Sequence, residues 1–265
     1  MTRTRCSSSL AVVSILAFAW LAIAHAEERE AAPPPSTAAA KSTAQAADVY
    51  RSGPETRYGI GKYYHGREIA RVMSHLGADW LERPERTLEE RPDEMIAALP
   101  IEPDHVLADI GAGSGYMSFR LSARVPEGKV LAVDIQPEML EMLEKQRSAR
   151  GIENVETVLG TLTDPRLPAD SVDLALLVDA YHEFSQPHEM LQALYRALRP
   201  GGLIALVEYR GEDPDVPILP THKMTRAQVR KELGALGFRY VRSYDALPQQ
   251  HLLFFEKPSP SAEGS

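Results

Sequence analysis

Strand-like and helix-like patterns alternate along the middle of this sequence, and this alternation constrains its fold more than any other feature. Short apolar runs, typical of buried strands, are each followed by a helical pattern or by a turn rich in glycine or proline. Repeated strand–helix units predict an α/β fold with a doubly wound, mostly parallel sheet and helices on both faces. The predicted strands span residues 106–110, 130–133, 155–159, 172–178 and 203–207, with two more around 240–244 and 251–255.

Proline and glycine mark the ends of the helices between these strands. Pro137 opens a helix that Gly151 closes, and Pro187 opens another. Proline is favoured at the first position of a helix and glycine just after the last. A further helical pattern follows the first strand over residues 117–125, and Thr225 is a candidate N-cap for the last helix.

A glycine-rich turn follows the first predicted strand. The stretch from Asp109 to Gly115 reads Asp-Ile-Gly-Ala-Gly-Ser-Gly, and Asp134 ends the next strand, 23 residues after Gly111. In doubly wound sheets ligands bind beyond the carboxyl ends of the strands, where such a carboxylate accepts hydrogen bonds from ribose hydroxyls. We therefore expect a nucleoside site. A dinucleotide-binding loop would need glycine at position 116, where this chain has Tyr116.

Four short motifs occur in order between Val106 and Tyr209. They are Val-Leu-Ala-Asp-Ile-Gly-Ala-Gly-Ser-Gly, Val-Asp-Ile, Asp-Ser-Val-Asp-Leu and Leu-Arg-Pro-Gly-Gly. Through them the chain resembles the class I S-adenosylmethionine-dependent methyltransferases. The resemblance implies a Rossmann-like sheet of seven strands whose last strand runs antiparallel, and S-adenosyl-L-methionine as the cofactor.

The resemblance also implies roles for residues at the strand ends. The glycine loop would surround the methionyl part of the cofactor, Asp134 would hold the ribose and Ile135 would pack on the adenine. The family often has an acid directly after the third strand, but here Asp164 comes later, which is a departure from the pattern. The expected cofactor-binding residues are Asp109, Gly111, Gly113, Gly115, Asp134, Ile135, Thr161, Leu162 and Asp179.

The segment after the fourth strand is expected to face the methyl acceptor, as it does in the family. It contains Tyr181, His182 and Glu183. Where the acceptor must lose a proton, a side chain that takes the proton speeds the reaction, and His182 is the candidate base with Glu183 or Tyr181 as its orienting partner. The alternative is a structural histidine held by backbone groups.

No metal site is expected. His182-Glu183 begins the zinc-hydrolase pattern H-E-x-x-H, but position 186 is Gln186, so the second histidine is missing. The remaining histidines considered, namely His65, His188, His222 and His251, are scattered along the sequence.

The amino-terminal segment has the layout of a secretory signal peptide over residues 1–26. Arg3 and Arg5 precede an apolar run that ends at Ala24-His25-Ala26, a small-x-small cleavage pattern. We expect an exported, periplasmic protein, or one anchored to the membrane by an uncleaved amino terminus. Cleavage would remove Cys6, the one cysteine of the chain, which excludes disulfides and cysteine chemistry from the mature protein.

Four further divisions of the chain are expected. Residues 27–47 are rich in Ala, Pro and charge and predict a disordered linker, because they bury too little apolar surface. Residues 48–100 are expected to form a helical cap, with an amphipathic helix from Tyr63 to Trp80 and a short helix after Pro92. The methyltransferase domain would span 101–258, and 259–265 would be a disordered tail.

The expected function is methyl transfer from S-adenosyl-L-methionine to an unidentified acceptor, for which a small molecule is preferred and a protein stays open. The formal net charge of −8 argues against a nucleic-acid partner. Two alternatives remain: a non-catalytic protein that binds S-adenosylmethionine or S-adenosylhomocysteine, and an NAD-type oxidoreductase, which Tyr116 disfavours.

Overall fold

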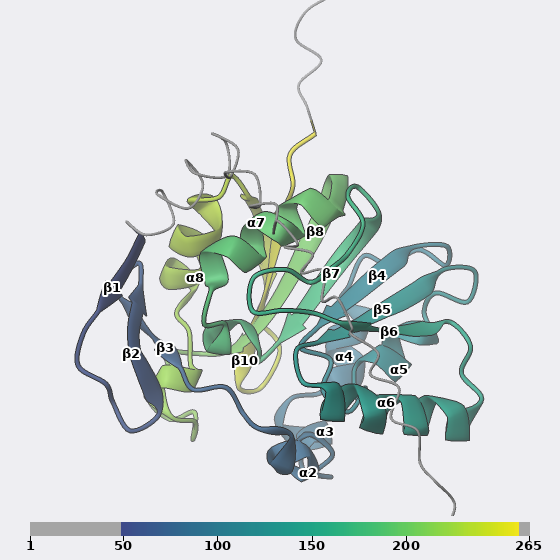
Figure 1. Cartoon of the computed structure of the whole chain (residues 1–265), viewed down its shortest axis with the longest axis horizontal. Coiled ribbons are helices and arrows are strands. Elements are labelled where there is room, and N and C mark those ends of the chain that lie inside the picture. Colours follow the sequence, from purple (N-terminus) through teal and green to yellow (C-terminus); the bar gives the residue numbers. More distant parts are fainter. Residues whose placement is uncertain (1–48, 260–265) are drawn as a thin grey trace, which may run out of the picture.

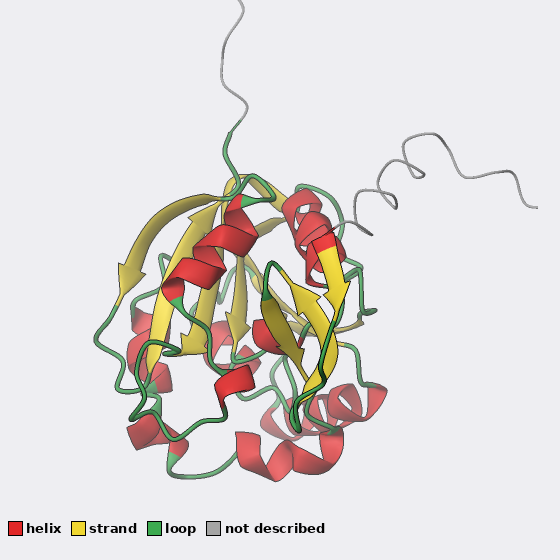
Figure 2. Ribbon diagram, turned by 90° about the vertical axis from the view of Figure 1, so that its left-hand side faces the viewer, coloured by secondary structure: helices red, strands yellow, loops and turns green. Residues whose placement is uncertain are grey.

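A computed structural model describes residues 49–259 of the chain. The predicted signal peptide (1–26) and linker (27–47) lie outside the described residues, as does the predicted tail except for Ser259. A seven-stranded sheet runs through the centre of the molecule, and a smaller sheet lies beside it (Figures 1 and 2).

The large sheet confirms the predicted doubly wound architecture. Its strands lie in the order β6-β5-β4-β7-β8-β10-β9, and the pairs from β6 to β8 are parallel. The last strand of the chain, β10, runs antiparallel to both of its neighbours, as the resemblance implied. The strands are β4 (Val106–Ile110), β5 (Lys129–Asp134), β6 (Val155–Leu159), β7 (Val172–Val178), β8 (Leu198–Tyr209), β9 (Arg239–Tyr244) and β10 (Gln250–Glu256).

Helices cover both faces of this sheet, because alternate strand residues point to opposite faces and both sets are apolar (Figure 1). One core joins Leu107 and Leu176 to α4, α5 and Leu143 of α6. The other joins Ala108 and Leu177 to α7 and α8. The helices are α4 (Pro92–Ala97), α5 (Ser118–Ser122), α6 (Pro137–Arg150), α7 (Pro187–Ala197) and α8 (Arg226–Gly234).

The expected end signals of these helices are present. Pro137 and Pro187 occupy the first turns of α6 and α7, and Gly151 ends α6 in the left-handed conformation, with φ of 64°. The Thr225 side chain accepts a hydrogen bond from the backbone N–H of Gln228, which caps α8.

The prediction of a helix from Tyr63 to Trp80 is wrong. The first half of this stretch belongs to a three-stranded antiparallel sheet formed by β1 (Tyr50–Ser52), β2 (Gly59–Tyr64) and β3 (Arg67–Ala70). His65 and Gly66 form a two-residue turn with φ of 49° and 96°. Two positive φ values match the tight turns that join twisted strands, so turn chemistry overrides the helical spacing of the apolar residues.

Only the second half of the cap is helical, and its helices are short. They are η1 (His75–Gly77), α2 (Ala78–Leu81) and α3 (Arg86–Glu89), followed by the expected helix after Pro92, which is α4. Leu76 and Trp80, expected on the buried stripe, are 85% and 51% exposed, so they do not pack as one helix face.

The small sheet is fixed to the main domain by polar contacts. The Arg67 guanidinium pairs with buried Glu232 of α8 at 3.0 Å, and Tyr50 donates to Glu189 of α7 at 2.6 Å. Within residues 49–259 no helix is both long enough and apolar enough to span a membrane.

Candidate functional site

A cavity of about 540 Å³ lies beyond the carboxyl ends of β4, β5 and β7, where the sequence predicted a ligand. Ligand pockets in proteins have volumes of about 300–1,000 Å³. The cap covers it with residues from Ala70 to Arg83, and the loop after β8 adds Pro217, Ile218 and Leu219. The lining is mostly apolar, with polar side chains from the strand ends.

The glycine loop after β4 forms one wall of the cavity. Gly111 and Gly113 have φ of 78° and 55°, a region that favours glycine. A Cβ on Gly111 would lie 2.8 Å from the Cβ of Ala180, and one on Gly113 would lie 2.6 Å from a methyl of Leu81. These positions therefore require glycine, and the backbone itself faces the cavity.

Asp134, at the end of β5, lies beside this loop in the cavity wall. Its carboxylate accepts hydrogen bonds from the backbone N–H groups of Gly113 and Gln136, both at 2.9 Å. Burial raises the pKa of Asp134 although these hydrogen bonds favour the charged form. Ile135 follows it in the wall, and Thr161 and Leu162 line the same side, in agreement with the expected set.

Asp179 follows β7 and carries a buried carboxyl group. Gln250 of β10 donates to one oxygen at 2.5 Å. Among residues 49–259, no group donates a hydrogen bond to the other oxygen, Oδ1. Burial and the nearby acids Glu90 and Glu208 raise the pKa of Asp179 well above its usual range. An unpaired buried acceptor beside a cavity is suited to a cationic ligand group, because such a group would supply the missing donors.

Two of the expected cofactor-binding residues lie behind the wall rather than in it. Asp109 is 2% exposed, and its carboxylate accepts a hydrogen bond from Ser118 of α5 at 2.6 Å. Gly115, with φ of 91°, packs against Phe119 and Leu143. Within the described chain neither residue lines the cavity, so their contribution is to hold the loop in place.

His182 also lines the cavity, on the single turn η2 (Tyr181–Glu183). Its Nδ1 lies 2.5 Å from Glu208 of β8, and both side chains are almost fully buried. Burial lowers the pKa of His182, but the charge and hydrogen bond of Glu208 more than offset this effect, so the pKa is raised. The orienting partner is therefore Glu208, at a strand end, and not Glu183 or Tyr181.

Tyr181 points away from the cavity. Its hydroxyl donates to Glu232 of α8 at 2.7 Å, next to the Arg67 guanidinium, and the side chain is fully buried. The residue helps to fix the cap to the main domain. Tyr181 was expected as an orienting partner of His182, but its hydroxyl is bonded to Glu232 and the residue does not line the cavity.

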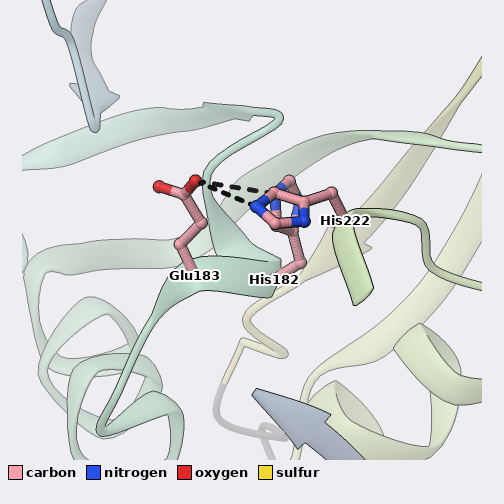
Figure 3. Close-up of side chains that lie close together, drawn as sticks. All are labelled: His182, Glu183 and His222. Atoms are coloured by element: carbon pink, nitrogen blue, oxygen red, sulfur yellow. Dashed lines mark ion pairs between the residues drawn. The ribbon is translucent and has the colours of Figure 1, made fainter. Parts of the chain in front are cut away.

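Glu183 lines the cavity together with His222 of η3 (Pro220–His222), a histidine to which the sequence analysis assigned no role. The Glu183 carboxylate lies 3.8 Å from Nε2 of His222 and 4.0 Å from Nε2 of His182 (Figure 3). Burial raises the pKa of Glu183, whereas burial and His182 lower the pKa of His222 to about 4. His182 and His222 are 40 positions apart in the sequence, so no local pattern indicated that they meet.

Comparison with known proteins is consistent with this geometry. A family model described as a methyltransferase domain matches residues 107–202. Demethylmenaquinone methyltransferase of Thermus thermophilus is 30% identical over 165 residues, which cover 62% of this chain and 72% of that protein. The chain belongs to the class I S-adenosylmethionine-dependent methyltransferases. A solved structure of such an enzyme from Aquifex aeolicus has the same fold, with a TM-score of 0.66 at 24% identity, over 70% of this chain and 99% of that one.

Other relatives share only part of their length with this methyltransferase-family chain. YcgJ of Bacillus subtilis, described as an uncharacterized methyltransferase, is 33% identical over 135 residues, 50% of this chain and 53% of that protein. The chain thus spans about half the length of several curated relatives that it matches.

The cavity fits the cofactor of the family, S-adenosylmethionine. The close-packed glycine wall leaves backbone groups for the methionyl part, and Oδ1 of Asp179 is an unpaired acceptor for its ammonium group. The Asp134 carboxylate beside the loop would be available to the ribose. Ile135 and Leu162 line the cavity and would offer apolar surface to the adenine ring.

Proposed function

We propose that this protein transfers a methyl group from S-adenosylmethionine to a nucleophilic atom of a small molecule bound in the same cavity. The observation that carries the proposal is that two chemically different sets of residues line the same cavity. The glycine loop, Asp134 and Asp179 suit the cofactor. His182, Glu183 and His222 are polar groups beside which a second molecule can bind.

The proposed chemistry needs little beyond alignment. The bound cofactor supplies a methyl group on a positively charged sulfur. The chain holds the acceptor in line with that methyl in a cavity that the cap partly covers, and such alignment is worth up to about 7–11 kcal/mol. Where the acceptor is protonated, Nε2 of His182 takes the proton, and Glu208 on Nδ1 stabilises the imidazolium that forms.

A small acceptor is favoured over a protein one by the shape of the site. The cavity has a volume of about 540 Å³, which is typical of small-molecule pockets, and residues of the cap line it together with Phe184 and Ile218. The Thermus thermophilus relative is named for a small molecule, demethylmenaquinone, which supports the same class of acceptor.

Calorimetric titration tests the cofactor half of the proposal. We expect the protein to bind S-adenosylhomocysteine and not NAD. Tighter binding of NAD would reject a methyltransferase and favour the oxidoreductase alternative. His105→Ala is a control that should leave binding unchanged, because His105 precedes the amino end of β4 and the cavity lies beyond its carboxyl end.

A screen of metabolite extracts tests the transfer itself. We expect one or more compounds to gain the mass of one methyl group when S-adenosylmethionine and the protein are both present. His182→Ala should abolish or strongly slow this gain and still bind S-adenosylhomocysteine, whereas His105→Ala should keep it. A protein that binds the cofactor but methylates nothing in such extracts or in protein mixtures would be the non-catalytic alternative.

The proposal includes export to the periplasm, supported by the basic, apolar and small-residue layout of residues 1–26 and by the cysteine-free sequence after it. Amino-terminal sequencing of the protein from fractionated cells would test it. A new terminus at Glu27 in the periplasmic fraction is expected, an intact terminus in the membrane fraction would indicate an anchor, and an intact terminus in the cytosol would refute export.

A further inference from the structure

Three polar side chains in the cavity wall, His182, Glu183 and His222, bring together two imidazoles and one carboxylate. His182 and Glu183 are neighbours on η2, and His222 reaches them from η3 (Figure 3). One donor atom of each side chain lies within 4.8 Å of the other two. His182 is 2% exposed and the other two are largely buried, so the three groups face one another inside the protein rather than on its surface.

We propose that His182, Glu183 and His222 bind one divalent transition-metal ion of the zinc class. Two histidines and one carboxylate form the ligand set of many catalytic zinc sites and of non-haem iron sites, in which other coordination positions stay open. The sequence pattern H-E-x-x-H fails here at Gln186, but the fold supplies the second histidine from a different loop. The proposal goes beyond methyl transfer and does not rest on it.

A second carboxylate holds the first ligand in the required orientation. Glu208 contacts Nδ1 of His182 at 2.5 Å, which leaves Nε2 directed toward Glu183 and His222. Metal-bound histidines typically donate their other ring N–H to a carboxylate, carbonyl or water, which fixes the ring and increases its basicity. Glu208 is fully buried and faces the site, so it fills this supporting role.

The other two ligands are also held by neighbouring groups. The backbone N–H of Met73, in the cap, donates to Oε1 of Glu183 at 3.1 Å. The hydroxyl of Thr221 lies 3.1 Å from Nδ1 of His222, so Nε2 is again the nitrogen directed at the carboxylate. Both histidines therefore present the same nitrogen to the centre of the cluster.

The distances leave room for an ion. Zn–N and Zn–O bonds of about 2.0–2.2 Å in a tetrahedral site separate neighbouring ligand atoms by roughly 3.4 Å. The Glu183 oxygen lies 3.8 Å and 4.0 Å from the two histidine nitrogens, too far for direct hydrogen bonds. These two distances exceed the tetrahedral value by roughly half an ångström, and all three donor atoms lie within 4.8 Å of one another, so small side-chain rotations on two short turns would have to close the site.

A bound ion would change the role of His182. Its Nε2 would then be a metal ligand and could not take a proton from the acceptor, so the two roles exclude each other. With the ion bound, an acceptor hydroxyl could coordinate in an open position, where the metal lowers its pKa and its proton passes to solvent.

Titration calorimetry with Zn²⁺ alone tests the site. The full chain, purified without a histidine tag and freed of metal with a chelator, is expected to bind one ion per chain without any cofactor present. Co²⁺ provides a second readout, because a tetrahedral site gives it an intense visible absorption. His222→Ala and Glu183→Gln should each weaken Zn²⁺ binding by roughly 100-fold or more, and Glu208→Gln by about 10–100-fold.

His105→Ala is the matched control, since it removes a histidine near the amino ends of the strands, away from the cavity, and should change neither readout. All variants should bind S-adenosylhomocysteine within about twofold of the parent, which separates failure of the metal site from failure of the proposed function. Glu183→Gln replaces one oxygen by nitrogen, so it tests the site even where His222→Ala unfolds the protein. Absence of Zn²⁺ binding, or binding that Glu183→Gln and His222→Ala leave unchanged, would overturn the proposal.

Discussion

At the scale of single residues, the protonation of His182 is set by one buried carboxylate. Burial alone would lower the pKa of the ring, and Glu208 reverses the direction of the shift. Glu208→Gln removes the charge and keeps the shape, so we expect the pKa of His182 to fall below its usual value of 6.5. Histidine NMR titration of metal-free protein measures this directly. Glu156→Gln, in an exposed ion pair with Lys129, should leave it unchanged, and an unchanged pKa in Glu208→Gln would mean that the pair is not formed.

Asp134 carries a second prediction at the same scale. Backbone N–H groups of Gly113 and Gln136 hold its carboxylate in one position. The side chain would therefore lose little conformational entropy when it binds the ribose. Asp134→Ala should weaken binding of S-adenosylhomocysteine by more than about tenfold, the loss of charge-assisted hydrogen bonds. Calorimetry measures the affinity, and Asp104→Ala, exposed in the turn before β4, is the control. Equal affinity in both variants would show that the ribose contact is misassigned.

At the scale of elements, Gln136 holds a short stretch of the cap, residues 73–75, beside the cavity. The amide of Gln136 donates to the carbonyl of Met73 at 3.0 Å and accepts from the backbone N–H of His75 at 2.8 Å. Gln136→Ala removes both bonds, and we expect the stretch to open more often, so that dissociation of S-adenosylhomocysteine accelerates by several-fold. Stopped-flow fluorescence of Trp80, which lines the cavity, follows dissociation in a Trp20→Phe background.

Gln146→Ala, on α6, whose N-cap is Gln136, is the control for this prediction. Gln146 donates to the carbonyl of Ser114 and forms no hydrogen bond with Met73 or His75 in the described structure. Equal dissociation rates in the two variants would mean that the stretch is held by its apolar contacts instead.

The main elements could be predicted from the sequence because local signals and burial agree there. Pro137 and Gly151 mark one helix, and the apolar run of β7 is buried on both faces. The cap could not be predicted in the same way, since Ile69 and Trp80 fit a helical spacing although the turn at His65 forces a hairpin.

The candidate site likewise has a part that could be predicted from the sequence and a part that could not. The glycine loop and Asp134 directly follow the strands that position them, so the local sequence pattern indicates where they lie. The partnership of His182 with Glu208 and His222 depends on how β8 and the loop after it return to η2. Such contacts between distant segments leave no periodicity in the chain.

At the scale of the whole molecule, the fold tolerates buried acids that reduce its stability at neutral pH. Burial raises the pKa of Asp109 from 3.8 to about 6. The folded state therefore binds a proton more tightly than the unfolded one, and stability falls as pH rises from about 4 to about 6. The ionised group costs up to about 3 kcal/mol above that range.

Asp109→Asn should consequently stabilise the protein more at pH 7.5 than at pH 4.5, while keeping an acceptor for Ser118. Urea denaturation at the two pH values measures the difference. The exposed Asp170→Asn serves as the comparison and should show no such growth with pH. If Asp109→Asn stabilised the protein equally at pH 4.5 and at pH 7.5, burial would not be raising the pKa of Asp109.

The position of β10 has a consequence for how the molecule comes together. The final strand is inserted between β8 and β9, and its first residue, Gln250, holds Asp179. Until residues 250–256 have left the ribosome or a translocation channel, the edge of β8 stays unpaired and β9 has no neighbour, since long-range pairing must wait for the distant segment. Completion of the sheet and the contact that holds Asp179 thus both depend on the final strand, and a chain truncated before Gln250 would lose both together.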